Sequence, residues 1–212
     1  MGRLADLDAV TLDANGTLIR LVDPVPKLDR LLREHGIERP EAVIRRAFDA
    51  EGAVYATRSV EARDAASFAT VQHECTGVFL EEVQADRLSA AEFAVSYVGA
   101  MEFELVPHAR ESLRRLRRLG LALAVVANFD LTLHKRLGEL GLVSEFSAIV
   151  TPVEAGAGKP DPWIFELALD RLGVSAGRAL HIGDSASDEE GARAAGMKFA
   201  WAPIRTALES WR

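Results

Sequence analysis

The chain has 212 residues, of which 49% are hydrophobic and 27% are charged. This composition is typical of a globular protein and excludes a disordered or collagen-like chain. The 32 acidic residues outnumber the 25 Lys and Arg residues, and the resulting net charge of −7 argues against nucleic acid or an anionic membrane surface as a partner.

Cysteine usage and the N-terminal segment favour a cytoplasmic location. The single cysteine, Cys75, cannot form an internal disulfide, which fits a reducing environment. The first residues lead directly into a strand-like segment, without the apolar stretch and cleavage site of a signal peptide. The longest apolar run, near residues 121–127, is too short to cross a bilayer. We therefore expect a cytoplasmic protein without membrane contact; the sequence indicates no oligomeric state.

Short apolar segments that end in polar or small residues are typical of buried parallel strands. Five such segments occur, at Ala9–Leu12, Leu121–Val126, Phe146–Val150, Ala179–Ile182 and Phe199–Trp201. Helical patterns lie between the last four, over Leu131–Leu140, Pro162–Leu172 and Asp188–Ala195. This alternation predicts an α/β fold with a Rossmann-like parallel sheet flanked by helices.

The long segment between the first and second strands carries no strand signal of comparable quality. Amphipathic helices are predicted over Pro26–His35, Pro40–Arg58, Val60–Val83 and Ser89–Met101, followed by a helix over Pro107–Leu119 that leads back into the sheet. We therefore expect a helical domain over residues 20–104, inserted into a core of residues 1–19 and 105–212.

Polar residues follow three of the predicted strands. Asp13 comes after the first, Asn128 after the second and Asp184 after the fourth. Ligands of open α/β sheets bind at the carboxyl ends of the strands, so we expect the two carboxylates to converge on one crevice. His181 lies within a predicted strand and is expected to be a buried core residue.

Four motifs surround these residues. The first is Asp13-Ala-Asn-Gly-Thr-Leu18, the second Val125-Val-Ala-Asn-Phe-Asp130, the third Gly158-Lys-Pro-Asp-Pro162, and the fourth His181-Ile-Gly-Asp-Ser185 with Asp188. In order and spacing they resemble the motifs of the haloacid dehalogenase-like hydrolase superfamily. The resemblance is to the phosphatase-like branch of capped subfamily I, in which a helical cap is inserted after the first motif.

The resemblance implies a phosphohydrolase or phosphoryl-transfer enzyme that uses Mg²⁺ and a small phosphorylated substrate. Asp13 would be the nucleophile that forms an aspartyl phosphate, and Lys159 would neutralise it and a phosphoryl oxygen. The implied metal ligands are Asp13, the carbonyl of Asn15, Asp184, and Asp188 either directly or through water. The implied substrate-binding positions are Gly16, Thr17, Ala127 and Asn128.

Two departures from the family pattern affect the expected activity. Asn15 stands where family phosphatases usually carry a second Asp as general acid and base, and losing that help costs roughly 10²–10⁴ in rate. Ala127 stands where a Ser or Thr hydroxyl would bind phosphate, and one hydrogen bond to a charged group contributes about 1.5–3 kcal/mol. The expected activity is therefore impaired.

Other functions remain compatible with the sequence. The 2-haloacid dehalogenases also lack the second Asp, but they use no metal, and Asp184 argues for one. A non-catalytic binding protein can also use an enzyme fold. An Asp→Asn substitution at position 15 of an active phosphatase would leave the same sequence. The cap would select the substrate, and the sequence assigns that role to no particular residue.

Overall fold

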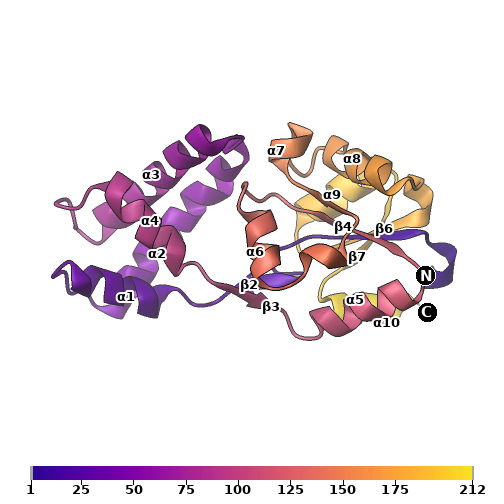
Figure 1. Ribbon diagram of the computed structural model, residues 1–212, viewed down its shortest axis with the longest axis horizontal. Helices are drawn as coiled ribbons and strands as arrows, with labels where there is room; N and C mark the ends of the chain where they lie inside the picture. Colours follow the sequence, from indigo (N-terminus) through magenta and orange to yellow (C-terminus); the bar gives the residue numbers. More distant parts are fainter. Residues whose placement is uncertain (1, 212) are drawn as a thin grey trace. The chain divides into compact units, whose positions relative to one another are not determined.

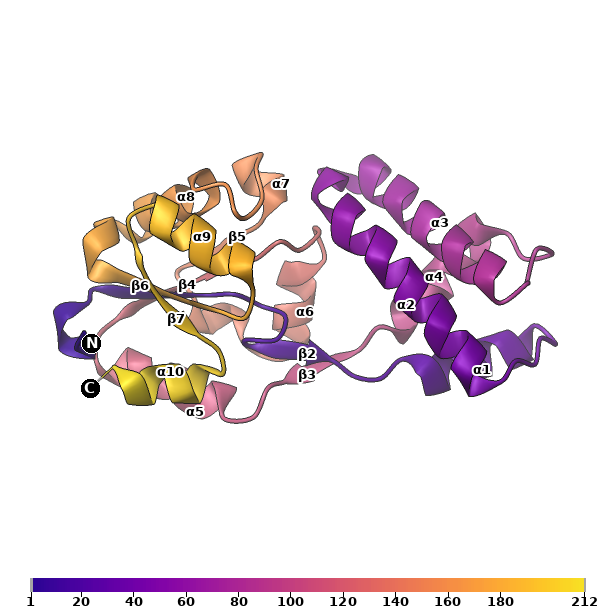
Figure 2. The ribbon, with the colours of Figure 1, turned by 180° about the vertical axis from the view of Figure 1, so that it is seen from behind.

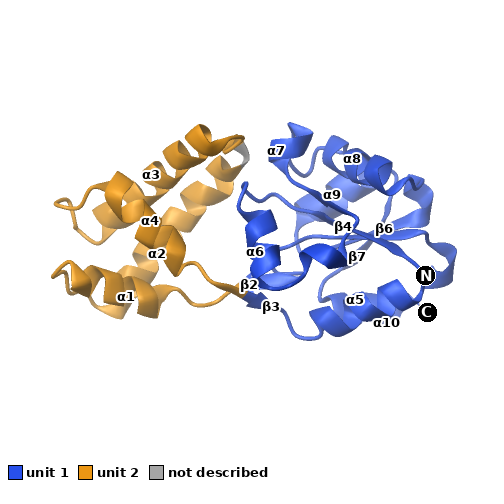
Figure 3. Cartoon of the chain, viewed as in Figure 1, with its two compact units in different colours: residues 1–20, 104–212 blue, residues 21–103 orange. Residues whose placement is uncertain are grey.

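The computed structural model describes residues 2–211, apart from the side chain of Val60. The chain divides into two compact units (Figure 3). Unit 1 contains residues 1–20 and 104–212, and unit 2 contains residues 21–103. Each unit has its own hydrophobic core, so each is described by itself.

A five-stranded parallel sheet forms the centre of unit 1 (Figure 1), in the order β5-β4-β1-β6-β7. The strands are β1 (Ala9–Leu12), β4 (Ala122–Val126), β5 (Ala148–Val150), β6 (Ala179–Gly183) and β7 (Lys198–Trp201). Leu12 in the central strand lies beside Val125 of β4 and Ile182 of β6. The residues that follow these three strands therefore share one edge of the sheet.

Helices cover both faces of this sheet (Figures 1 and 2). On one side α8 (Trp163–Leu172) packs on β4 and β5, and α9 (Ala186–Ala194) packs on β6 and β7. On the other side lie α5 (Ala109–Arg118) and α10 (Ile204–Ser210), which also pack against each other. Because both faces are covered, strands β1 and β6 are buried throughout, and β4 is buried apart from its first residue. The predicted α/β class is confirmed.

Shorter elements complete unit 1. Helices α6 (Leu133–Glu139) and α7 (Pro152–Ala155) follow β4 and β5. Single 3₁₀ turns span Leu4–Asp6, Val143–Glu145 and Ala176–Arg178. Among residues 2–211, no helix combines the length and apolarity needed to span a membrane.

A second, two-stranded sheet was not predicted. It pairs β2 (Ile19–Leu21) with β3 (Phe103–Leu105), where the chain leaves unit 1 and returns to it. The sequence signal is weak because each strand has three residues and an exposed charged residue at its centre. Those two residues, Arg20 and Glu104, form an ion pair of 2.6 Å across the sheet.

Unit 2 is helical, with α1 (Val25–Glu34), α2 (Glu41–Arg58), α3 (Ala65–Glu82) and α4 (Ala90–Ala100). The predicted helix over Val60–Val83 is wrong at its start, because a 3₁₀ turn over Ser59–Glu61 precedes α3. Asp64 begins α3 with a capping box: its carboxylate accepts from the Ser67 amide at 2.8 Å, and the Ser67 hydroxyl accepts from the Asp64 amide at 3.0 Å.

Replacing Asp64 with Ala removes the acceptor for the Ser67 amide. We expect the free energy of unfolding to fall by about 1 kcal/mol, the usual effect of losing an N-cap side chain. Asp49→Ala, at an exposed site within α2, is the matched control. Chemical denaturation of both variants measures the difference, and an Asp64→Ala variant as stable as Asp49→Ala would contradict this account of where α3 begins.

Candidate active site

Three carboxylates meet at the carboxyl edge of the unit 1 sheet. Asp13 follows β1, Asp184 follows β6, and Asp188 lies in the first turn of α9. One carboxylate oxygen from each lies within 4.8 Å of those of the other two. Asp13 and Asp188 are buried, whereas Asp184 is exposed. The strands are far apart in sequence, and their parallel register is what brings these groups together.

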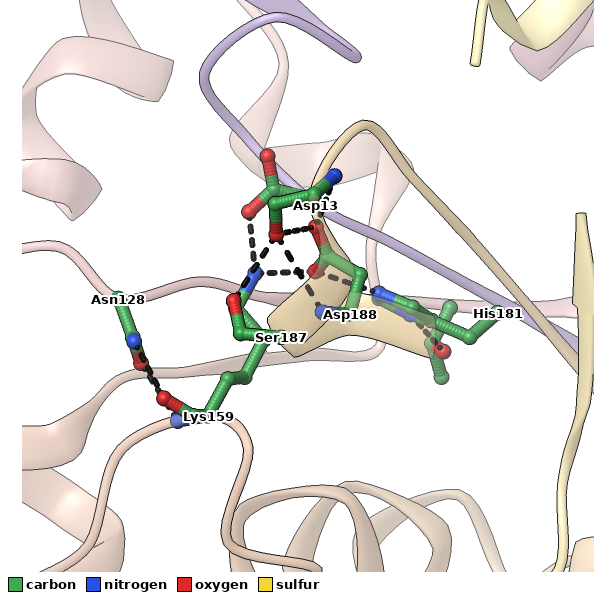
Figure 4. A network of polar contacts seen from close by, with 8 residues as sticks. Asp13, Asn128, Lys159, His181, Ser187 and Asp188 are labelled. Atoms are coloured by element: carbon green, nitrogen blue, oxygen red, sulfur yellow. Dashed lines mark hydrogen bonds and ion pairs between the residues drawn. The ribbon is translucent and has the colours of Figure 1, made fainter. Parts of the chain in front are cut away.

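Lys159 supplies the positive charge between two of these carboxylates (Figure 4). Its Nζ donates to Oδ1 of Asp13 and to Oδ1 of Asp188, each at 2.5 Å. Burial alone would lower the pKa of Lys159, but the two carboxylates outweigh it and raise that pKa above its ordinary value. Lys159 is therefore a buried ammonium group at neutral pH, paired on two sides.

Burial and the positive charge of Lys159 shift the pKa of Asp13, the candidate nucleophile, in opposite directions. Burial raises the pKa of Asp13 to about 6; Lys159 limits the rise, while Asp188 and Asp184 add to it. Asp184 is exposed, yet partial loss of hydration and the charge of Asp188 raise its pKa as well. Asp13 is thus ionised at neutral pH by a narrower margin than an exposed aspartate.

Asp188 accepts hydrogen bonds on both carboxylate oxygens. Oδ1 accepts from Lys159 Nζ and from His181 Nε2, the latter at 3.0 Å. Oδ2 accepts from the amide of Ser185 at 3.1 Å and from its hydroxyl at 2.5 Å. Burial would raise the pKa of Asp188, but His181 and Lys159 hold it well below its usual range. The carboxylate is therefore ionised and fixed in orientation.

Two glycines make room for these carboxylates. A Cβ on Gly16 would lie 1.9 Å from Oδ2 of Asp184, and the φ of Gly16 is +84°, where side chains are disfavoured. A Cβ on Gly183 would lie 2.3 Å from Cγ of Asp188. Any side chain at either position would displace a carboxylate of the cluster.

Asn128 binds the backbone that carries Lys159. Its side-chain Oδ1 accepts from the Lys159 amide at 2.7 Å, and its Nδ2 donates to the Lys159 carbonyl at 2.8 Å (Figure 4). The sequence motif offered Asn128 only as a substrate contact. Its link to Lys159 was missed because it depends on how a strand end and a distant loop meet.

The remaining predicted residues lie around this edge. Asn15 is exposed and forms an isolated bridge with Ile19. Thr17 is fully buried, and its hydroxyl has no hydrogen-bond partner among the described residues. Ala127 is buried at the end of β4. His181 is buried as expected, and burial lowers its pKa to about 4, so its imidazole is neutral.

The donor set of the cluster fits a magnesium ion. Mg²⁺ prefers oxygen ligands and needs only one or two carboxylates when water and substrate complete its shell. Asp13 and Asp184 provide such oxygens within reach of each other, and Asp184 is open to solvent. Asp188 belongs to the same cluster, but its oxygens already receive four hydrogen bonds.

Comparison with known proteins identifies the family. The sequence profile of haloacid dehalogenase-like hydrolases matches residues 7–196. The chain belongs to this family. It is 31% identical to human haloacid dehalogenase-like hydrolase domain-containing protein 3 over 93% of this chain and 82% of that protein. It is 36% identical to the phosphoserine phosphatase of Thermus thermophilus over 76% of this chain and 66% of that protein.

Other matches in this hydrolase family are shorter or more distant. The protein 3 homologue of Danio rerio is 40% identical over 42% of this chain, a match that covers 37% of that protein. A haloacetate dehalogenase of Moraxella sp. is 30% identical over 57% of this chain and 53% of that protein. A magnesium-bound structure of the HAD hydrolase YfnB from Bacillus subtilis has a TM-score of 0.69 at 20% identity, covering 92% of this chain and 88% of that one. As in the haloacid dehalogenase-like fold, a helical segment that includes α2–α4 is inserted into the chain of the sheet-containing unit.

The raised pKa of Asp13 makes its ionisation unfavourable for folding. An acid with a higher pKa in the folded state costs stability above that pKa, and the cost vanishes below the unfolded value, here 3.8. We expect metal-free Asp13→Asn to be more stable than the parent at pH 7.5 by roughly 1–3 kcal/mol, since one pKa unit corresponds to about 1.4 kcal/mol.

The measurement is chemical denaturation in chelator at pH 7.5 and pH 3.5, with Asp170→Asn at an exposed site of α8 as the control. The gain should largely disappear at pH 3.5, where the parent carboxyl is protonated in the folded state and mostly protonated in the unfolded state. Loss of stability in Asp13→Asn at pH 7.5 would mean that the ion pair with Lys159 outweighs burial.

Proposed function

We propose that the chain is a magnesium-dependent phosphohydrolase that acts on a small phosphorylated metabolite through an aspartyl phosphate on Asp13. The observation that carries the proposal is the meeting of Asp13, Lys159 and Asp184 at the carboxyl ends of β1 and β6. The similarity to a phosphoserine phosphatase and the magnesium in the YfnB structure support it.

In the first step a carboxylate oxygen of Asp13 attacks phosphorus, and the bond from phosphorus to the leaving oxygen breaks. Lys159, already paired with Asp13, neutralises charge on the nucleophile and on a phosphoryl oxygen. Asp13, Asp184 and the carbonyl of Asn15 would hold Mg²⁺, and Asp188 would contact it through water. When bound, the ion supplies positive charge that lets two anions approach.

Asn15 determines which substrates can react well. A carboxamide does not transfer a proton at neutral pH, so an alkoxide leaving group receives no help from position 15. Acyl and aryl phosphates have leaving groups that need little protonation. The second step, attack of water on the aspartyl phosphate, lacks a base at the same position. We therefore infer a preference for activated phosphates and slow release of phosphate from Asp13, with Ala127 weakening phosphate binding.

Replacing Asn15 with Asp restores a group able to donate and accept a proton. Turnover of a sugar phosphate should rise by about 10²–10⁴, the contribution typical of general acid–base catalysis. Asn15→Gln, which keeps the amide, is the control and should give no gain. Steady-state release of phosphate from a sugar phosphate and from acetyl phosphate, both with Mg²⁺, provides the comparison. The rate of phosphoryl transfer to Asp13 should gain less with acetyl phosphate, because its leaving group needs little protonation.

The same proteins test the intermediate. Rapid acid quench of the parent chain with acetyl phosphate and Mg²⁺, followed by intact-mass spectrometry, should show a phosphate adduct that is absent in Asp13→Asn. Asn15→Asp should reduce the adduct by accelerating its hydrolysis. No adduct together with no gain from Asn15→Asp would favour a non-catalytic binding protein.

A second candidate function is a 2-haloacid dehalogenase, favoured by Asn15 and by the similarity to a haloacetate dehalogenase. Here Asp13 would displace halide from carbon and form an ester without a metal. The two candidates differ in their need for a metal ion: the acidic cluster would bind Mg²⁺ in a phosphohydrolase, whereas a dehalogenase uses no metal.

Calorimetric titration of the parent chain should therefore show Mg²⁺ binding, and Asp184→Asn should abolish it because a ligand carboxylate is lost. Asp170→Asn should bind as the parent does, since Asp170 lies on α8 outside the cluster. A parent chain that binds no Mg²⁺ yet releases chloride from 2-chloropropionate would support the dehalogenase instead.

A further inference from the structure

A line of polar side chains crosses the buried centre of the unit 1 sheet. His181 lies in the middle of β6 and is fully buried, beside Thr11 of β1. Its Nδ1 is 2.8 Å from the Thr11 hydroxyl oxygen, and its Nε2 is 3.0 Å from Oδ1 of Asp188 (Figure 4). Phe165 meets the imidazole edge-on, with ring centroids 4.9 Å apart.

We propose that His181 is a positioning residue of the active site: through Nε2 it holds Asp188, and through Asp188 it fixes Lys159 against Asp13. Thr11 belongs to the same network because its hydroxyl pairs the other ring nitrogen, Nδ1. The proposal deepens the proposed function, and only its kinetic test rests on that function.

The tautomer follows from what each partner can do. An ionised carboxylate only accepts hydrogen bonds, so Nε2 of His181 carries the hydrogen that Asp188 receives. Nδ1 of the neutral ring then has a lone pair and no hydrogen. The Thr11 hydroxyl therefore donates to Nδ1, and each nitrogen of a fully buried ring is paired.

The arrangement does more than fill space. Phe165 and Phe199 lie against the imidazole, so an apolar side chain would suit this position. Thr11, His181 and Asp188 are all 0% exposed, and burying three polar groups is unfavourable unless each is bonded. Their hydrogen bonds form one connected path, which ends at the nucleophile through Lys159.

Asp188 has few donors that fix its position. Lys159 and His181 donate to Oδ1, and Ser185 donates to Oδ2. Without His181, the mobile Lys159 side chain would be the only donor to Oδ1. The distance between Lys159 and Asp13 would then be less closely fixed.

Kinetics with acetyl phosphate and Mg²⁺ test the proposal. His181→Leu removes the donor at similar bulk, and kcat should fall about 10–100-fold with KM little changed, as is typical when a group supporting a ligand or catalytic residue is lost. His181→Gln places an amide NH₂ near the former Nε2 and should recover much of this loss. Thr11→Val should cause a smaller loss. Ser112→Ala, at a buried site on α5, is the control for a buried polar change outside the path.

Two readouts do not depend on turnover. ¹⁵N NMR of labelled histidine should show His181 with hydrogen on Nε2 in the parent chain and also in Thr11→Val, because Asp188 remains as the acceptor. Crystal structures should show the distance from Lys159 Nζ to Asp13 Oδ1 lengthened in His181→Leu and restored in His181→Gln.

The outcomes separate the two claims. If the parent chain turns over no phosphate, the proposed function fails, and the NMR and crystal readouts still decide the role of His181. Hydrogen on Nδ1, an unchanged Lys159–Asp13 distance in His181→Leu, or an unchanged kcat in a folded His181→Leu would each overturn the proposal. If His181→Leu does not fold, Thr11→Val and His181→Gln carry the same comparison.

Discussion

The ammonium group of Lys159, held between the carboxylates of Asp13 and Asp188, is the interaction on which the site depends. A carboxylate buried at the end of a strand loses hydration and resists ionisation, and an un-ionised acid is a poor nucleophile. Lys159 offsets that loss at Asp13, and Asp188 in turn keeps Lys159 charged. Removing Lys159 would leave two buried carboxylates without a compensating charge.

The fold contains several features that keep this lysine in position. Asn128, at the end of β4, bonds both backbone groups of Lys159. The loop that follows Lys159 packs closely on α9. A Cβ on Gly191 of that helix would lie 2.9 Å from the carbonyl oxygen of Pro160. Ser185 begins α9 with a capping box that includes Asp188, so one interaction both starts the helix and orients a site carboxylate. Stability and function thus share the same residues at this edge of the sheet.

Sequence patterns predicted much of this arrangement because they reflect local constraints. Strands such as β1 and β6 are mostly apolar, which indicates a parallel sheet covered on both faces. Polar residues at the ends of these strands indicate its ligand-binding edge. The start of α3 was misplaced because a continuous helical pattern concealed the capping role of Asp64. Strands β2 and β3 were missed because they are too short to show a period.

The parts of the site that could not be predicted depend on contacts between distant segments. The motifs did not indicate that Asn128 binds the backbone of Lys159, because strand β4 and the lysine loop meet only in the fold. The pairing of His181 with Thr11 depends on the register of β6 against β1. Likewise, burial separates Asp13 from the exposed Asp184, although both are strand-end aspartates in the sequence.

The central claim is that Lys159 keeps a buried Asp13 ionised at neutral pH. The most direct measurement is the titration of the Asp13 side-chain carboxyl by ¹³C NMR, in metal-free protein, for the parent chain and for Lys159→Met. We predict a titration near pH 6 in the parent chain and a markedly higher one in Lys159→Met, because burial would then act without the compensating charge. An Asp13 pKa that is the same in both proteins, or lower in Lys159→Met, would contradict the claim.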